Sequence, residues 1–239
     1  MNPKQDRRIK IAGSGYYVPD KIMTNADLEK LVDTSDEWIT TRSGIKERHI
    51  AAPEQASSDL AIEAAKQALD DAGMTKDDID LIIVCTATPD TAFPSTACWV
   101  QKGLEADHIP ALDIGAACSG FLYGLIVSES LILSGTNKRI LLIATEALSK
   151  ITDWEDRTTA VLFGDGAAAA VLEESDDDSG ILSHFWKADG NLAELLLQPG
   201  GGSRMPCSHE VVDQKMPFLR MRGNEVFKHA VKRMGEAAA

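Results

Sequence analysis

The stretch DIGAACSGF (residues 113–121) lies between two apolar segments of different length. The segment that leads into it, IPALDIG (109–115), has the length of a strand, and the one that follows, GFLYGLIVSESLILSG (120–135), has the length of a helix. The chain is therefore predicted to pass from a strand to a helix at a cluster of alanine and glycine residues that contains Cys118.

The same alternation of strand-like and helix-like segments extends on both sides of this stretch. The apolar runs LIIVC (81–85) and KRILLIATEAL (138–148) predict buried strands, and IKIAGSGYYVP (9–19) predicts another. Apolar residues at helical spacing predict a helix over 57–73, and the Gly-Asp-Gly pattern within 159–175 predicts a hairpin. Alternating strands and helices predict an α/β fold, with a mostly parallel sheet covered by helices on both faces.

The pattern begins again in the last quarter of the chain, which gives a predicted division into residues 1–179 and 180–239. In the second part we predict a strand at 180–190, another strand at 218–223 and an amphipathic helix at 224–239. Asn224 is predicted to cap this helix. A parallel strand pair needs a further strand after such a helix, so we expect the second part to be incomplete.

Composition and charge exclude several classes of function. The formal net charge is −13, so a surface that follows nucleic-acid phosphates is not expected. The four cysteines are Cys85, Cys98, Cys118 and Cys207. They form no C-x-x-C pair, so no metal site is predicted from them. The N-terminus lacks the apolar segment of a signal peptide, and no stretch approaches the ~18 apolar residues of a membrane helix. We therefore expect a cytoplasmic protein with no membrane or nucleic-acid partner.

The predicted position of Cys118 favours a nucleophile. The first turn of a helix has unpaired N–H groups and a positive dipole end, and both stabilise a thiolate. Small residues over 116–120 leave room for an acyl group, and open α/β sheets bind ligands at the carboxyl ends of their strands. From the residues alone a buried structural cysteine is the open alternative, and Cys85 and Cys98 fit that alternative.

Several segments resemble the β-ketoacyl-[acyl-carrier-protein] synthase III family, the condensing enzymes that start type II fatty acid synthesis. In family order they are VDTSDEWITTRSGIKERHI (32–50), AFPST (92–96), DIGAACSGF (113–121), FGDGAAAAVL (163–172) and GNEVFK (223–228). The resemblance implies the thiolase-like fold, a layered αβαβα arrangement of two related repeats. It also implies that this chain holds a complete N-terminal repeat and only the beginning of the second.

The resemblance implies an activity as well. Cys118 would take an acyl group from acyl-CoA, and malonyl-[acyl-carrier protein] would then lose CO₂ and attack the thioester to give a β-ketoacyl product. The partners implied are acyl-CoA and malonyl-acyl carrier protein. No separate cofactor is implied, and the full-length form is expected to be a homodimer.

The resemblance assigns further residues to the site. Those that match the family's coenzyme A contacts and pantetheine tunnel are Thr34, Trp38, Arg42, Arg157, Met221 and Asn224. Phe93 matches a residue that closes the acyl pocket of the partner subunit, and Phe163 matches a residue of the tunnel wall. Without the resemblance, Trp38 and Arg42 share a helix face at i, i+4, and an exposed cation–π pair explains them equally well.

A basic segment stands out in this acidic chain. Residues 220–233 hold five Lys and Arg residues against Glu225 alone. Because the carrier protein in such systems is acidic, we predict a docking patch at Lys228, Lys232 and Arg233. A solvated helix face without a partner is the alternative.

The chain departs from the family in one respect. The family completes its site with a histidine in an H-Q-A-N-type motif and a later asparagine, and none of the five histidines lies in such a motif. We therefore expect a C-terminally truncated form that acquires the acyl group poorly and does not condense. Two alternatives stay open: a non-catalytic acyl- or CoA-binding fragment, and another acyl-CoA-primed condensing enzyme of the superfamily.

Overall fold

The computed structural model describes residues 7–238, which form two compact units. The first, the sheet unit, comprises the described residues up to Lys21 together with Ala51–Ala147 and Asp165–Trp186. The second unit comprises Ile22–Ile50, Leu148–Gly164 and the described residues from Lys187 onward. The boundary between residues 179 and 180 stays a prediction.

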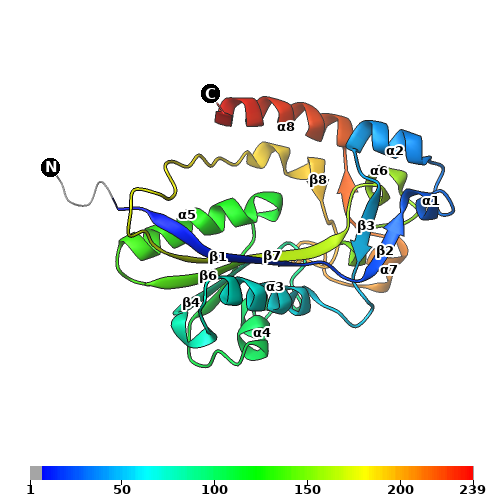
Figure 1. The fold of residues 1–239 in the computed structure, drawn as a ribbon. Coiled ribbons are helices and arrows are strands. Elements are labelled where there is room, and N and C mark those ends of the chain that lie inside the picture. Colours follow the sequence, from blue (N-terminus) through cyan, green and yellow to red (C-terminus); the bar gives the residue numbers. More distant parts are fainter. Residues whose placement is uncertain (1–6, 239) are drawn as a thin grey trace. The chain divides into compact units, whose positions relative to one another are not determined.

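A five-stranded sheet in the order β1-β7-β6-β4-β5 forms the centre of the sheet unit (Figure 1). Its strands are β1 (Ile9–Tyr17), β4 (Leu81–Cys85), β5 (Ala111–Ile114), β6 (Arg139–Ala147) and β7 (Asp165–Glu174). β4 pairs in parallel with β5 and β6, whereas β7 pairs antiparallel with β1 and β6. The prediction of a mostly parallel sheet was therefore wrong on the β1–β7 side. The chain between β6 and β7 does not cross the sheet as a helix, so β7 returns in the opposite direction.

Helices cover both faces of this sheet, as the alternating pattern predicts (Figure 1). α3 (Ser57–Asp71) and α4 (Thr96–Gly103) lie on one face, and α5 (Gly120–Leu133) lies on the other. β4 is buried along its whole length because alternate side chains enter the two cores. Ile82 packs among residues of α3 and α4, while Ile83 packs with Ile132 of α5. The 3₁₀ helices of this unit are η1 (Lys76–Asp78) and η2 (Ala117–Ser119).

α5 and the turn before it are more apolar than the sequence analysis allowed. Ala117–Ser134 is long and apolar enough to cross a membrane, with a mean hydropathy of 1.5, and 28% of these residues are buried. In the sheet unit the helix packs against β4 and β6. Gly124 has no room for a side chain there, because a Cβ would lie 2.4 Å from Cδ1 of Leu142.

The second unit begins with short capped elements. They are β2 (Lys21–Thr24), α1 (Asn25–Leu28), α2 (Asp36–Ser43), β3 (Glu47–Ile50), η3 (Leu148–Lys150) and α6 (Arg157–Ala160), with β2 paired to β3. Thr24 caps α1 and Ser35 caps α2, and α2 ends at Gly44 with φ of 75°, as the glycine predicts. Leu28, Ile39 and Val161 form the small core of these elements.

The C-terminal part of the second unit contains η4 (Gly190–Leu195), β8 (Leu196–Leu197), α7 (His209–Asp213), β9 (Arg220–Met221) and α8 (Gly223–Ala238). β8 pairs with β9. Of the strand predicted at 218–223, only Arg220–Met221 is in a strand, whereas the helix predicted at 224–239 is confirmed by α8 over the described residues. The strand predicted at 180–190 is absent from this described stretch. The hairpin predicted at 159–175 was wrong, because its first half contains α6. Asn224 lies inside the first turn of α8, which begins at Gly223, so it is not the N-cap.

β1 lies close to α3 because two of its residues lack a side chain. A Cβ on Gly13 would lie 2.4 Å from the backbone nitrogen of Ala72, and one on Gly15 would lie 2.4 Å from the carbonyl oxygen of Ala64. Both obstacles are backbone atoms, which cannot rotate away as a side chain does. The strand and the helix are therefore held at a distance that only glycine permits.

We predict that Gly15→Val destabilises the protein by about 3 kcal/mol, the upper end of the range for overpacking. The valine side chain would force β1 away from α3. The free energy of unfolding in urea, followed by circular dichroism, measures the effect.

The matched control is Ser14→Val, the same substitution at an exposed residue on the opposite side of the strand. It should change the free energy of unfolding by no more than about 0.5 kcal/mol. Equal stability losses in the two variants would contradict the close packing of β1 on α3.

Candidate active site

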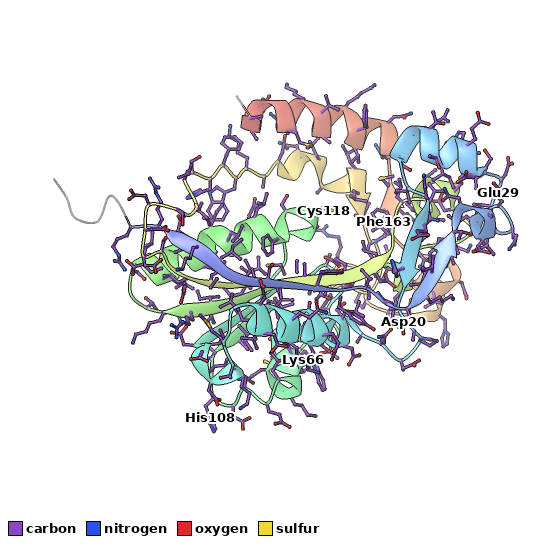
Figure 2. All side chains as sticks on the ribbon, in the orientation of Figure 1. Asp20, Glu29, Lys66, His108, Cys118 and Phe163 are labelled. Carbon is purple, nitrogen blue, oxygen red and sulfur yellow. The ribbon has the colours of Figure 1, made fainter. Side chains whose placement is uncertain are left out.

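Cys118 lies where the sequence predicts it, between the end of a strand and the start of a helix. β5 ends at Ile114, η2 contains Cys118, and α5 begins at Gly120. The side chain of Cys118 is exposed, and Figure 2 shows it at the beginning of α5. The structure therefore rules out the alternative of a buried structural cysteine at this position.

The backbone turns sharply just before Cys118. Ala117 has φ of 44°, a left-handed conformation that costs a non-glycine residue about 1–3 kcal/mol. The turn is closed by the N–H of Ser119, which donates to the carbonyl oxygen of Ala116 at 3.1 Å. This conformation places Cys118 on the outside of the strand-to-helix turn, where a substrate has access to its sulfur.

The start of α5 is held against the end of β4. A Cβ on Gly120 would lie 3.0 Å from Cβ of Cys85, and one on Gly124 would lie 2.9 Å from Sγ of Cys85. Both glycines are buried, and Cys85 is the last residue of β4. The contact fixes the position of the helix end, and with it the position of Cys118, relative to the sheet.

The other cysteines have different surroundings. Burial raises the pKa of Cys85 to about 12, so its thiol stays protonated near neutral pH. Cys98 is partly buried on α4, with its Sγ 3.2 Å from Oγ of Ser95. Cys207 is exposed but lies in the second unit, on the loop before α7. Among the described cysteines, Cys118 is thus the exposed one at the end of a sheet strand.

In the second unit, Trp38, Arg42 and Arg157 form a cluster. The guanidinium carbon of Arg42 lies 4.5 Å from the centre of the Trp38 ring, and that of Arg157 lies 5.0 Å from it. Nη1 of Arg157 also donates to the carbonyl oxygen of Asp33 at 2.8 Å. The structure therefore brings together three residues that the sequence analysis assigned to coenzyme A.

Contacts with neighbouring residues hold Trp38 in place. The backbone N–H of Trp38 donates to Oγ of Ser35 at 3.1 Å, and the side chain packs against Leu28, Ile39 and Val161. Next to Asp33, the buried hydroxyl of Thr34 has no hydrogen-bond partner within residues 7–238. A planar ring, two permanent positive charges and an unused hydroxyl together suit a ligand that carries an aromatic base and phosphates.

The remaining predicted residues lie on other elements of the chain. Phe93, in the sheet unit, is 86% exposed, and Phe163 is partly buried in the second unit. Met221 is partly buried in β9, and Asn224 is exposed in the first turn of α8. The residues predicted to bind the carrier protein are all exposed on α8, namely Lys228, Lys232 and Arg233.

Arg233 differs from the two lysines beside it. Its guanidinium forms ion pairs with Glu236 at 2.9 Å and with Asp189 at 3.4 Å. Neither Lys228 nor Lys232 forms an ion pair within the described residues. The positive charge available to a partner on this helix is therefore mostly that of the two lysines.

Sequence reasoning missed two carboxylates at the ends of sheet strands. Glu146 in β6 accepts the N–H of Ala87 at 2.9 Å and the hydroxyl of Thr88 at 2.8 Å. Burial raises the pKa of Glu146, and these hydrogen bonds oppose the rise. Asp113 in β5 accepts two N–H groups at the start of α4, at 2.7 and 2.8 Å. The only sequence signal was an acidic residue in each otherwise apolar strand.

Within residues 7–238, no group of three or more His, Cys, Asp and Glu side chains is placed to hold a metal ion. The structure offers two separate candidate features: an exposed thiol in the sheet unit, and an aromatic, cationic cluster in the second unit.

Comparison with known proteins gives one consistent family. The model of the family 3-oxoacyl-[acyl-carrier-protein (ACP)] synthase III matches residues 112–190, which include Cys118. A β-ketoacyl-[acyl-carrier-protein] synthase III of Caldanaerobacter subterraneus is 55% identical over 227 residues, which are 95% of this chain and 69% of that relative.

Solved structures agree with this assignment. The 3-oxoacyl-[acyl-carrier-protein] synthase III of Aquifex aeolicus is similar with a TM-score of 0.87 and 49% identity, over 95% of this chain and 69% of that one. A priming β-ketosynthase of the R1128 polyketide pathway is similar with a TM-score of 0.85 and 32% identity, over 98% of this chain and 69% of that one. These likenesses confirm the thiolase-like α/β fold that the sequence predicted. The chain belongs to the β-ketoacyl-[acyl-carrier-protein] synthase III family.

Proposed function

We propose that this protein is an acyltransferase of the kind that initiates fatty acid synthesis by condensing an acyl-CoA primer with malonyl-[acyl-carrier protein]. Residues 1–239 hold only part of the site for this reaction, because the histidine of an H-Q-A-N-type motif and the later asparagine are not among them. The thiolate of Cys118 attacks the thioester carbonyl of acyl-CoA, and coenzyme A leaves as its thiolate, which takes up a proton from water. Malonyl-[acyl-carrier protein] then loses CO₂, and its carbanion attacks the acyl group on Cys118. The β-ketoacyl product leaves and the thiolate is restored, so one difficult condensation is divided into two easier steps.

The observation that carries this proposal is the exposed thiol of Cys118 at a strained strand-to-helix turn. The surrounding residues are small, so a flat thioester has access to the sulfur from outside the sheet unit. The N–H groups at the start of α5 supply positive potential for a thiolate and for the oxyanion that forms on attack. A non-catalytic binding fragment would not need this combination.

We predict that radiolabelled acetyl-CoA transfers its acetyl group to the protein and that Cys118→Ser abolishes the label. A serine hydroxyl is far less ionised than a thiol near neutral pH, so it does not attack the thioester at a measurable rate. Acid-stable radioactivity on the denatured protein measures the transfer, and peptide mapping locates it.

Cys207→Ser is the matched control, since Cys207 is the other fully exposed cysteine. This variant should incorporate as much radiolabel as the unmodified protein. Label that persists in Cys118→Ser, or that disappears in Cys207→Ser, would refute the assignment of the nucleophile.

We further propose that the cluster of Trp38, Arg42 and Arg157 binds the adenine and phosphates of coenzyme A, with Thr34 as an additional hydrogen-bond donor. The two guanidinium groups over one ring, and the unpartnered hydroxyl nearby, support this role. Met221, Asn224 and Phe163 are proposed as contacts of the pantetheine chain, as the family resemblance implies.

Trp38→Leu should weaken coenzyme A binding roughly 5- to 150-fold, because base–aromatic stacking contributes about 1–3 kcal/mol. Leucine preserves the apolar contact with Leu28 and Ile39 but removes the aromatic face. Isothermal titration with coenzyme A measures the dissociation constant.

Trp99→Leu provides the comparison, because the Trp99 ring also carries a cation, with Nζ of Lys102 5.6 Å from its centre. It should leave the dissociation constant unchanged within about twofold, since Trp99 is outside the proposed contacts. If both tryptophans proved equally important or equally dispensable, the proposed location of coenzyme A would be wrong.

We propose that the acidic carrier protein docks on α8 through Lys228 and Lys232, with a smaller contribution from Arg233. The two lysines are exposed, four residues apart and without ion pairs in the described chain, whereas Arg233 is neutralised by two carboxylates. Exposed complementary charge mainly accelerates association and makes it depend on salt.

The double variant Lys228→Glu/Lys232→Glu should weaken carrier-protein binding at low salt by at least about tenfold, because like charges then face each other. The difference from the unmodified protein should shrink at high salt. Surface plasmon resonance with malonyl-[acyl-carrier protein] measures both. Lys66→Glu/Lys102→Glu, with the same change of net charge on the sheet unit, should have little effect. Equal losses in the two double variants would show that only net charge matters.

The remaining proposals concern assembly and location. We propose a homodimer in which Phe93 closes the acyl pocket of the partner subunit. The 86% exposure of Phe93, and the 38% exposure of Leu112 on the edge strand β5, support an apolar contact with a second copy. We also propose a cytoplasmic enzyme that uses acyl-CoA as a substrate and needs no separate cofactor. In this proposal the apolar face of α5 serves to pack the protein interior.

A further inference from the structure

The segment between β4 and α4, residues 86–95, carries Phe93 at its exposed end. Thr86 is buried where the segment leaves the sheet, while residues 91–94 are all exposed. An exposed loop tip has few contacts of its own, so the position of Phe93 depends on how the two ends of the segment are attached. The attachments involve three carboxylates of the sheet unit.

The end that leads into α4 is held by two of these carboxylates. The oxygens of Asp113 accept the N–H groups of Thr96 and Ala97 at 2.7 and 2.8 Å. Further back, Asp90 accepts the N–H and the hydroxyl of Ser58 at 3.0 and 2.6 Å. These bonds tie the start of α4 to β5 and the segment itself to α3.

The end that leaves β4 is held by Glu146, the last but one residue of β6. Its Oε1 accepts the N–H of Ala87 at 2.9 Å, and its Oε2 accepts the hydroxyl of Thr88 at 2.8 Å. Oγ1 of Thr88 in turn accepts the N–H of Ala147 at 2.8 Å, so its own proton is directed toward Glu146. One side chain thus binds two consecutive residues of the segment to the neighbouring strand.

The choice of a carboxylate at this position carries a cost for folding. Glu146 is partly buried, and it forms no ion pair with a lysine or arginine within residues 7–238. Burial disfavours its charged form and raises its pKa. A neutral or apolar side chain would be less costly at the end of a strand. The two hydrogen bonds to the segment offset the burial cost, and they point to a role beyond folding.

We infer that Glu146 is a positioning residue that fixes the path of residues 86–88 and thereby sets where Phe93 stands against the acyl chain of the primer. This inference rests on the proposed function, which gives Phe93 its contact with the primer. Loss of Glu146 would loosen the β4 end of the segment, where the hydroxyl of Ser57 still donates to the carbonyl oxygen of Thr88 at 2.6 Å, while Asp113 and Asp90 still held the other end. The side chain of Phe93 would then shift while the segment stayed attached to the sheet unit. As a result, the selectivity among primers of different length would change.

The experiment compares two primers on the full chain. The rate constants for acylation of Cys118 by acetyl-CoA and by butyryl-CoA are measured at limiting concentration, and their ratio is the selectivity. We expect Glu146→Ala to change this ratio by about fivefold or more, because the segment loses both of its charged hydrogen bonds to β6. Phe93→Ala should change it in the same direction. The double variant should show no further change, because both substitutions act through the same residue.

Two further variants separate positioning from loss of stability. Thr88→Val removes one of the two bonds to Glu146, together with the acceptor for the N–H of Ala147, and leaves the carboxylate in place. It should change the selectivity in the same direction, and it keeps the test open if Glu146→Ala does not fold. Asp80→Asn is the matched control. Asp80 binds the N–H groups of Lys138 and Arg139 at 2.7 and 3.3 Å, at the opposite ends of the same two strands. It should lower stability and leave the selectivity unchanged.

The outcomes distinguish this inference from the proposed function. If neither primer labels Cys118 of the unmodified protein, the proposed function fails. If labelling occurs but Glu146→Ala and Thr88→Val leave the ratio within about twofold of the original, the positioning role is overturned. Equal changes of selectivity in Asp80→Asn, or fully additive changes in the double variant with Phe93→Ala, would overturn it as well.

Discussion

The close contact between the start of α5 and the end of β4 determines where the proposed nucleophile of this protein lies. Gly120 and Gly124 let the helix approach Cys85 to a distance at which a Cβ would collide. The helix end, the strained turn at Ala117 and the thiol of Cys118 are therefore fixed to the most buried strand of the sheet. A nucleophile attached to a loop alone would lack this fixed position, which catalysis requires because small displacements are costly.

The two ends of the central strands have separate roles. At the amino ends, Asp80 holds the start of β6 by its backbone, which serves the fold. At the carboxyl ends, Glu146 and Asp113 hold the segment that carries Phe93, close to the turn that carries Cys118. Such a division is expected for open α/β sheets, in which ligands bind at the carboxyl ends of the strands.

The elements that could be predicted from the sequence are those whose signals are local. Apolar runs placed β4 and β6, helical spacing placed α3, and glycine placed the end of α2. The direction of β7 and the helix at 157–160 could not be predicted, because pairing direction depends on where the chain travels between strands. Trp38 and Arg42 were adjacent on a helix, so their contact was predictable. The contacts of Glu146 join residues about sixty positions apart, and no local pattern indicates them.

The position of Arg42 and Arg157 next to a single indole has a consequence for the stability of the protein with and without a bound ligand. The guanidinium carbons of both arginines lie within 5.0 Å of the ring centre, and the ion pairs of the described residues include neither Arg42 nor Arg157. In the proposed binding mode, the phosphates of coenzyme A would contact both cations and so join α2 to α6, elements that are far apart in the sequence. A ligand bound in this way would act as a structural tie, and the resistance of this unit to heat and to proteases would depend on how much of it is bound.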